Sequence, residues 1–318
     1  MLIATVAATV VLWLAVDTPS PIPPTGSTSA WSSGDQAEHR VVSASWVTEA
    51  LADPERQVSI VDLSPTDRYA EEHIPGAVHG WWQDGMDPHA RVYGERFFPE
   101  TDQDGRARWF AALGIEPGST VVVYDDDGNQ HAARLVWLLV DSGHADAMIL
   151  DGGLAAWKSA GQEVESGAPV LADDSAVITG HGALPVATTD ELEAIVAAPT
   201  RNVTVVDVRS EDERDDTMKG VLPVGQIPGS VWLPREAWYA GDGLLLPPDD
   251  LRRLLEDAGI APGDPVVVYG QFGIDTGLPW VVLTALGYED IRIYDQGWVT
   301  WAEVDSRPIE SLQETSPR

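Results

Sequence analysis

The chain has 318 residues, enough for about two domains of ordinary size, each with its own hydrophobic core. Its 51 acidic residues against 19 basic ones give a formal charge of -32, and only two of the basic residues are lysines. Nucleic acids and anionic lipid surfaces are therefore not expected as partners, because phosphate binding needs clustered Lys and Arg. There are no cysteines, which excludes disulfides, thiolate metal sites and thiol nucleophiles.

The charge balance is typical of a halophilic protein, which stays soluble at high salt because screening shortens the reach of self-repulsion. An ordinary acidic soluble protein would have the same composition. Both alternatives stay open at the level of the sequence.

Residues 1–39 are expected to lie outside the globular fold. The apolar run from Met1 to Val16 is shorter than the ~20 residues that cross a bilayer, so it is typical of a signal-peptide core or anchor, and a Pro- and Ser-rich linker follows it. We expect an exported or membrane-tethered protein. The alternative is a mis-assigned start codon and a cytoplasmic protein, since no Lys or Arg precedes Arg40 and no clear cleavage site follows the run.

The remaining chain alternates short apolar strands with helical patterns. In chain order, the first half predicts strands at 58–63, 120–124 and 147–150 and helices at 106–115 and 131–143. The second half predicts strands at 203–208, 265–269 and 291–294 and helices at 249–260 and 278–287. Continuous apolar strands joined by helix-length crossovers indicate an α/β fold with a parallel sheet covered by helices on both faces.

The second half repeats the first in order and spacing. Asp62 matches Asp207, Tyr124 matches Tyr269, and Asp151 matches Asp295, each pair separated by 144 or 145 residues. The Ile-Pro-Gly motifs that begin at residues 74 and 227 are further apart, which places a short insertion in the second half. These ordered matches indicate two tandem domains. We assign them to 40–166 and 186–310, with a linker at 167–185 and a tail at 311–318.

The order of these motifs resembles the rhodanese superfamily. Asp-Val-Arg at 207–209, Ile-Pro-Gly in both halves, VVVY before a glycine-containing loop, and Tyr-Asp-x-x-Trp-x-x-Trp at 294–301 carry the resemblance, which covers about residues 41–309. In particular the chain looks like the tandem-domain thiosulfate and 3-mercaptopyruvate sulfurtransferases. The resemblance implies an N-terminal domain without catalytic function and a C-terminal domain that carries the active loop.

In that family a cysteine follows VVVY in the second domain, takes a sulfane sulfur as a persulfide and passes it to cyanide or a thiol. A loop at the start of a helix suits this chemistry, because inward-pointing N–H groups hold an anion and lower the pKa of a thiol. The resemblance implies that such a loop here would receive a small sulfur-containing anion. It is formed by Gly270, Gln271, Phe272, Gly273, Ile274, Asp275 and Thr276, with a helix from about Gly277. Gly270 stands at the cysteine position, so no catalytic nucleophile is expected.

Three charged residues near this loop have two interpretations each. Asp275 would repel an anionic sulfur donor, and it is also interpreted as an exposed aspartate favoured by the helix dipole; these two interpretations are compatible. The resemblance implies that Arg209 fixes substrate anions, whereas the alternative is a pair with a nearby acid such as Glu213. Arg235 either faces the same cleft or lies on the surface.

In the first domain Asp125 occupies the position equivalent to Gly270. Asp125 to Asp127 do not meet the calcium-loop spacing, so we expect a solvated turn there and no nucleophile. The seven histidines include no metal-binding pair, and no metal or cofactor is expected. Trp157 and Trp301, at matching repeat positions, are expected in the core, and Trp81 and Trp82 in a groove between the domains.

The sequence favours a rhodanese-like protein that has lost sulfur transfer and acts as a binding or regulatory pseudoenzyme. An active sulfurtransferase is the alternative if Gly270 replaces a native cysteine. Hydrolysis through Asp275 is disfavoured, because phosphatases with related loops need a cysteine and a loop arginine. No protein partner can be named from the sequence.

Overall fold

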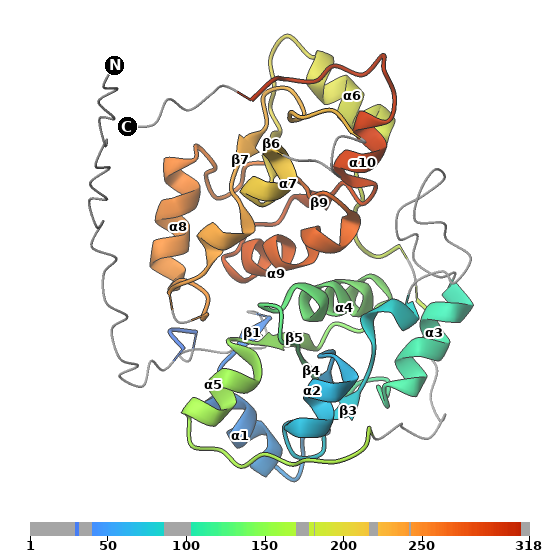
Figure 1. The fold of residues 1–318 in the computed structure, drawn as a ribbon, viewed down its shortest axis with the longest axis vertical. Coiled ribbons are helices and arrows are strands. Elements are labelled where there is room, and N and C mark those ends of the chain that lie inside the picture. The colour runs from blue at the N-terminus through green and yellow to red at the C-terminus, as the bar shows by residue number, and fades with distance from the viewer. Residues whose placement is uncertain are drawn as a thin grey trace, which may run out of the picture.

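The computed structural model describes residues 29–31, 40–85, 103–169, 178–180, 182–215, 222–241 and 243–312. The described chain forms two halves that meet along a pair of helices (Figure 1). The expected signal or anchor segment lies outside the described residues. Among the helices described, none is long and apolar enough to cross a membrane.

The first half contains a five-stranded parallel sheet in the order β1-β5-β4-β2-β3. Its strands are β1 (Val41–Val42), β2 (Val58–Asp62), β3 (Val78–His79), β4 (Thr120–Tyr124) and β5 (Ala147–Leu150). Its helices are α1 (Ala44–Ala52), α2 (Thr66–Glu71), α3 (Gln103–Ala112), α4 (Gln130–Asp141) and α5 (Gly153–Ser159), with a short 3-10 helix η2 (Trp82–Gly85). The predicted strands and helices of this half are confirmed.

The second half contains a four-stranded parallel sheet in the order β7-β6-β8-β9. Its strands are β6 (Thr204–Asp207), β7 (Val231–Trp232), β8 (Val266–Tyr269) and β9 (Ile291–Ile293). Its helices are α6 (Thr189–Ala197), α7 (Glu211–Asp215), α8 (Pro248–Asp257), α9 (Gly277–Ala285) and α10 (Gly297–Ala302), with 3-10 helices η4 (Arg235–Trp238) and η5 (Gly273–Thr276). Val186 bridges Ile293 in parallel, at the place that β1 has beside β5.

The repeat seen in the sequence extends to individual hydrogen bonds. The Tyr124 hydroxyl accepts a hydrogen bond from the Ile74 backbone N–H at 3.0 Å, and the Tyr269 hydroxyl accepts one from Ile227 at 3.1 Å. Trp157 and Trp301 are both buried, as expected from their matching positions. Each half is therefore a copy of one α/β unit.

Strand residues alternate between two cores. In β4, Val121 and Val123 pack in a core that also contains side chains of α3, α4, α8 and α9, whereas Val122 and Tyr124 pack against α1, α2 and α5. The alternation follows from strand geometry, in which successive side chains point to opposite faces. Because the first of these cores contains residues of both halves, the two sheets share one apolar interior across the interface between α4 and α9.

Polar contacts cross the same interface. Arg134 on α4 is buried, and its Nη2 donates to Asp295 Oδ1 at 2.5 Å while its guanidinium lies 4.6 Å from the Trp137 ring centroid. Asp151, the repeat equivalent of Asp295, accepts a hydrogen bond from the Leu245 backbone N–H at 2.9 Å. The aspartate that follows the last strand of each half, within two residues of its end, therefore contacts the other half.

Gly277, the first residue of α9, sets how closely the two central helices approach. A Cβ atom at this position would lie 2.6 Å from the backbone nitrogen of Arg134 and 2.9 Å from the carbonyl carbon of Ala133. Backbone atoms cannot move aside as the end of a side chain can, so any larger residue would push α9 away from α4.

We therefore expect Gly277→Ala to lower the free energy of unfolding by about 1–3 kcal/mol, the usual cost of overpacking. Gly241→Ala is the matched control, because nothing lies within 4 Å of a Cβ built there. Its effect should stay below about 0.5 kcal/mol. Urea unfolding monitored by tryptophan fluorescence measures both. Equal effects of the two substitutions would contradict this packing.

Candidate functional site

The loop Gly270–Thr276 lies at the carboxyl end of β8 and leads into α9. Ligands of open parallel sheets bind at this edge, so its position suits a ligand site. Gly270 is buried and its carbonyl accepts a hydrogen bond from the Trp298 backbone N–H at 2.9 Å. The helix that the sequence placed at about Gly277 begins there.

The space beside Gly270 is filled by Asp275. A Cβ atom on residue 270 would lie 2.4 Å from Asp275 Cβ and 2.7 Å from its Oδ2, distances that real Cβ contacts essentially never show. The same Oδ2 accepts a hydrogen bond from the Phe272 backbone N–H at 3.0 Å, and the Gln271 backbone also hydrogen-bonds the carboxylate. The backbone N–H groups of this loop, which the sequence suggested would bind an anion, therefore bind the loop's own Asp275 carboxylate.

The environment of Asp275 disfavours its charge. Burial raises the pKa of this carboxyl to about 7, and the negative charge of Glu213 adds to the shift, while Arg235 and the two backbone N–H groups act in the opposite direction. Of the two interpretations from the sequence, the exposed aspartate is wrong, because Asp275 is half-buried and turned back into the loop. When it is ionised, this carboxyl repels a second anion.

The equivalent loop of the first domain is filled in the same way. Asp125 Oδ1 accepts hydrogen bonds from the backbone N–H groups of Asp127 at 2.9 Å and Asn129 at 2.6 Å, and its Oδ2 accepts one from Ala132 at 2.9 Å. Burial raises its pKa to about 6. The expected solvated turn is wrong for Asp125, which is buried, although Asp126 and Asp127 are exposed. The aspartate is buried because three backbone donors at the start of α4 hold it.

Arg209 lies in the core and forms an ion pair with a nearby acid, which was the second interpretation given for it from the sequence. Its Nε and Nη2 donate to the carboxylate of Asp207 at 2.9 and 2.7 Å, and Nη2 also donates to the Gly225 carbonyl at 2.7 Å. The partner is thus Asp207 and not Glu213. Because Arg209 is fully buried, contact with a substrate anion would require it to leave this pair.

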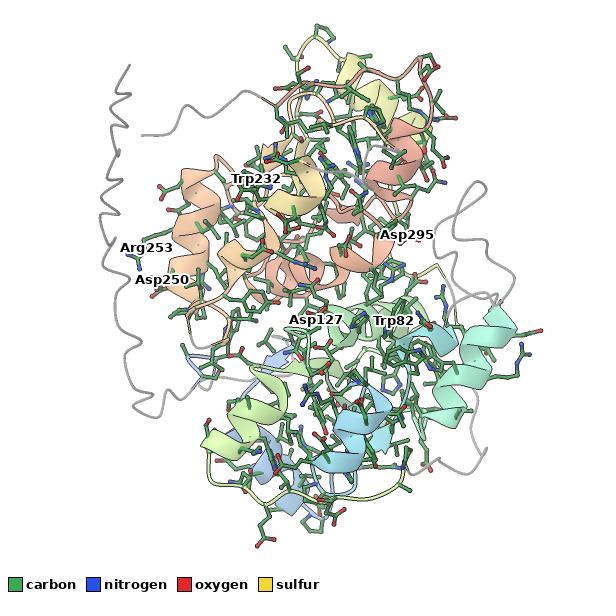
Figure 2. All side chains as sticks on the ribbon, viewed as in Figure 1. Trp82, Asp127, Trp232, Asp250, Arg253 and Asp295 are labelled. Atoms are coloured by element: carbon green, nitrogen blue, oxygen red, sulfur yellow. The ribbon has the colours of Figure 1, made fainter. Side chains whose placement is uncertain are left out.

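Arg235 faces the loop from η4. It contributes to the electrostatics of both Asp275 and Glu213, and it is only half-exposed. It also lines a cleft of about 340 Å³ between the domains, together with residues of the first domain. Figure 2 shows one of them, Asp127, between the two halves of the molecule. The structure therefore places Arg235 at a cleft beside the loop.

A larger cleft, of about 760 Å³, lies against the loop of the first domain. Gly128 and Gly243 line both clefts. Apart from Gly243, the residues that line the larger cleft belong to the first domain.

Two residues of this region were not singled out from the sequence. Gln130 Nε2 donates to the Tyr239 hydroxyl at 3.4 Å, and that hydroxyl donates to the Gly128 carbonyl across the domain interface. Neither residue belongs to a repeated motif, so no sequence signal could have found them. Of the two tryptophans expected in a groove between the domains, Trp82 stacks on His131, in the first turn of the interface helix α4, with ring centroids 4.7 Å apart.

The family model for the rhodanese-like domain matches the sequence at residues 43–160 and again at residues 188–304. The chain belongs to the rhodanese family. The two matched ranges agree with the tandem domains read from the sequence and with the two α/β units of the structure.

A sulfur carrier protein and two thiosulfate sulfurtransferases align with 85% to 93% of the chain. The sulfur carrier protein TtuD of Thermus thermophilus is 31% identical over 291 residues, covering 86% of this chain and 97% of TtuD. The thiosulfate sulfurtransferase of Pseudomonas aeruginosa is 32% identical over 273 residues, covering 85% and 96%. The putative thiosulfate sulfurtransferase SseA of Mycobacterium tuberculosis is 32% identical over 309 residues, covering 93% and 97%.

Solved structures share the fold. YnjE superposes with a TM-score of 0.72 at 21% identity, covering 86% of this chain and 69% of that one. A Y353A variant of EanB in complex with ergothioneine gives a TM-score of 0.72 at 20% identity, covering 89% and 73%. Both show that the overall fold of this chain occurs in solved structures.

The burial of Asp275 predicts a pH dependence of stability. Its pKa of about 7 in the folded protein exceeds the ordinary value of about 3.9, so between these pH values the folded state holds a proton that the unfolded state lacks. The free energy of unfolding of the unmodified protein should therefore fall, relative to Asp275→Asn, as the pH rises from about 4 to about 7.

Urea unfolding of both proteins at fixed ionic strength measures this difference. Asp257→Asn, which changes an exposed aspartate of α8, is the control and should give a curve parallel to that of the unmodified protein. Parallel curves for Asp275→Asn as well would show that the carboxyl is not held in the loop.

Proposed function

We propose that this rhodanese binds a ligand without transferring sulfur, as a binding or regulatory pseudoenzyme. The observation that carries the proposal is the Asp275 carboxylate, which lies where a side chain on residue 270 would project. The relatives named above are a sulfur carrier protein and thiosulfate sulfurtransferases. Sulfur transfer is therefore the activity to test in this chain.

Persulfide chemistry needs a thiolate that attacks the outer sulfur of the donor and then carries it. No residue of this chain can supply one, because the sequence contains no cysteine. The loop hydroxyl, on Thr276, is buried and donates to the Gly273 carbonyl at 2.6 Å, which directs its proton away from any ligand. A hydroxyl is also a poor acceptor of sulfane sulfur.

The loop also lacks the charge that an anionic donor needs. In a rhodanese active loop, backbone N–H groups at a helix start would bind thiosulfate. Here the Gln271 and Phe272 backbone groups bind Asp275, and Glu213 adds a second carboxylate nearby. Thiosulfate would have to displace one carboxylate in the field of another.

The alternative is an active sulfurtransferase in which Gly270 replaces a native cysteine. Asp275 weighs against it, because a cysteine Cβ would overlap with the Asp275 side chain in this loop conformation. Glycine at 270 and aspartate at 275 are mutually compatible, and a loop built around cysteine would need a different residue or orientation at position 275.

Thiocyanate formation from thiosulfate and from 3-mercaptopyruvate, with cyanide as acceptor, tests the proposal. We expect none above the uncatalysed rate for the unmodified protein. Gly270→Cys with Asp275→Ala should gain measurable turnover, because the thiol then has space and the loop N–H groups are released. Gly270→Cys alone should be slower than the double variant by on the order of tenfold or more.

Asp275→Ala alone is the control for the released loop and should remain inactive. Circular dichroism of all four proteins shows whether each is folded. Turnover by the unmodified protein would overturn the proposal, and a single Gly270→Cys variant as active as the double variant would show that Asp275 does not block the site.

A further inference from the structure

Two residues of the N-terminal stretch are buried where the domains meet. Ser29 and Trp31 come from residues 1–39, which the sequence placed outside the globular fold, yet both are 6% exposed. Trp31 belongs to the apolar core that contains residues of both halves. Figure 1 shows this short blue segment at the junction of the two halves. The N-terminal stretch therefore packs on the globular fold at this point.

The Ser29 hydroxyl connects this segment to both domains through one carboxylate. It donates to Asp151 Oδ2 at 2.7 Å and accepts a hydrogen bond from the Trp31 backbone N–H at 3.3 Å. The other oxygen of Asp151, Oδ1, accepts a hydrogen bond from the Leu245 backbone N–H of the second domain at 2.9 Å. Asp151 is buried, so the loss of either donor leaves a buried acceptor with one partner fewer.

Leu245 belongs to a turn that forms part of the wall of both clefts. The turn consists of residues 239–241 and 243–245, and Tyr239 bridges Leu245 across it. The Ala240 backbone N–H donates to the Leu244 carbonyl at 2.7 Å. Gly243 lines both clefts, and Tyr239 lines the smaller one. The position of this turn therefore sets the shape of the candidate ligand surface.

Hydrogen bonds at both ends hold this turn on the first domain. At one end the Tyr239 hydroxyl donates to a backbone carbonyl of the first domain, and at the other end the Leu245 N–H donates to Asp151. Ser29 supports the second attachment, because it binds the other oxygen of the same carboxyl group and restricts its rotation. Trp31 keeps Ser29 in place, since the burial of its indole ring stabilises the contact.

We propose that Ser29 and Trp31 form a strap that keeps the wall of the clefts closed against the first domain. While the strap is bound, Asp151 is fixed and the turn stays attached at both ends. When the strap detaches, Leu245 loses a fixed acceptor and the turn opens. A segment this short detaches at a lower free energy than the unfolding of a domain requires. The strap thus controls access to the clefts, a role that goes beyond the proposed function and is measured without a ligand.

Amide hydrogen exchange of the full-length chain, followed by NMR, tests the strap. Ser29→Ala and Trp31→Ala should each raise the exchange rate of the Leu245 amide about fivefold or more, the effect of losing one hydrogen bond. The amides of β4 and β8, in the middle of the two sheets, should exchange as in the unmodified protein. An unchanged Leu245 rate in either variant, or the same rise across the whole fold, would overturn the proposal.

Ser306→Ala and Trp232→Ala are the matched controls. Ser306 is exposed, and Trp232, on the edge strand β7, is among the most exposed large hydrophobic residues of the described chain. Both lie outside the strap, so the Leu245 amide should exchange at the unmodified rate in each. A rise equal to that of the strap variants would show that Leu245 does not report on the strap.

Thiol labelling measures the opening of the wall itself, because the chain contains no cysteine and a single one can be introduced. Leu244 is partly buried and lies against Gly152, which lines the larger cleft. A maleimide should label Leu244→Cys about fivefold faster or more when Trp31→Ala is added. Equal labelling rates with and without Trp31→Ala would show that the wall does not open when the strap is lost, and the proposal would fail.

Discussion

The carboxylate of Asp275 occupies the space beside Gly270, and the chemistry open to the second domain depends on that contact. A helix-start loop offers backbone N–H groups that need an acceptor. In a sulfur-transferring rhodanese the acceptor would be the substrate or the persulfide, whereas here the chain supplies its own. The fold can then keep the loop intact without a bound anion, which explains how the scaffold survives the absence of the thiol.

In both halves an aspartate side chain fills the loop after the strand, but the aspartate stands at a different position of the loop. In the first domain the filling residue, Asp125, directly follows the strand, and in the second domain Asp275 folds back from five residues further along. Both carboxyls have raised pKa values because burial outweighs their hydrogen bonds. The smaller cleft between the domains, which Gln130 and Arg235 line, lies outside these filled loops.

The strands, helices and tandem repeat could be predicted because apolar runs and repeated motifs are local properties of the chain. The position of Gly270 at a loop start followed from the same pattern. The direction of the Asp275 side chain, the pairing of Arg209 with Asp207, and the burial of Asp125 depend on contacts that no local pattern records. The contacts of Tyr239 and Arg134, and those of the matched pair Asp151 and Asp295, require the two domains to be docked.

A crystal structure grown or soaked in thiosulfate tests the central claim most directly. We expect Asp275 Oδ2 within hydrogen-bond distance of the Phe272 backbone nitrogen, as at 3.0 Å here, and no anion in the loop. An Asp275 side chain turned out to solvent, with thiosulfate held by the loop N–H groups next to Gly270, would contradict it. That result would restore the loop as a site for sulfur anions.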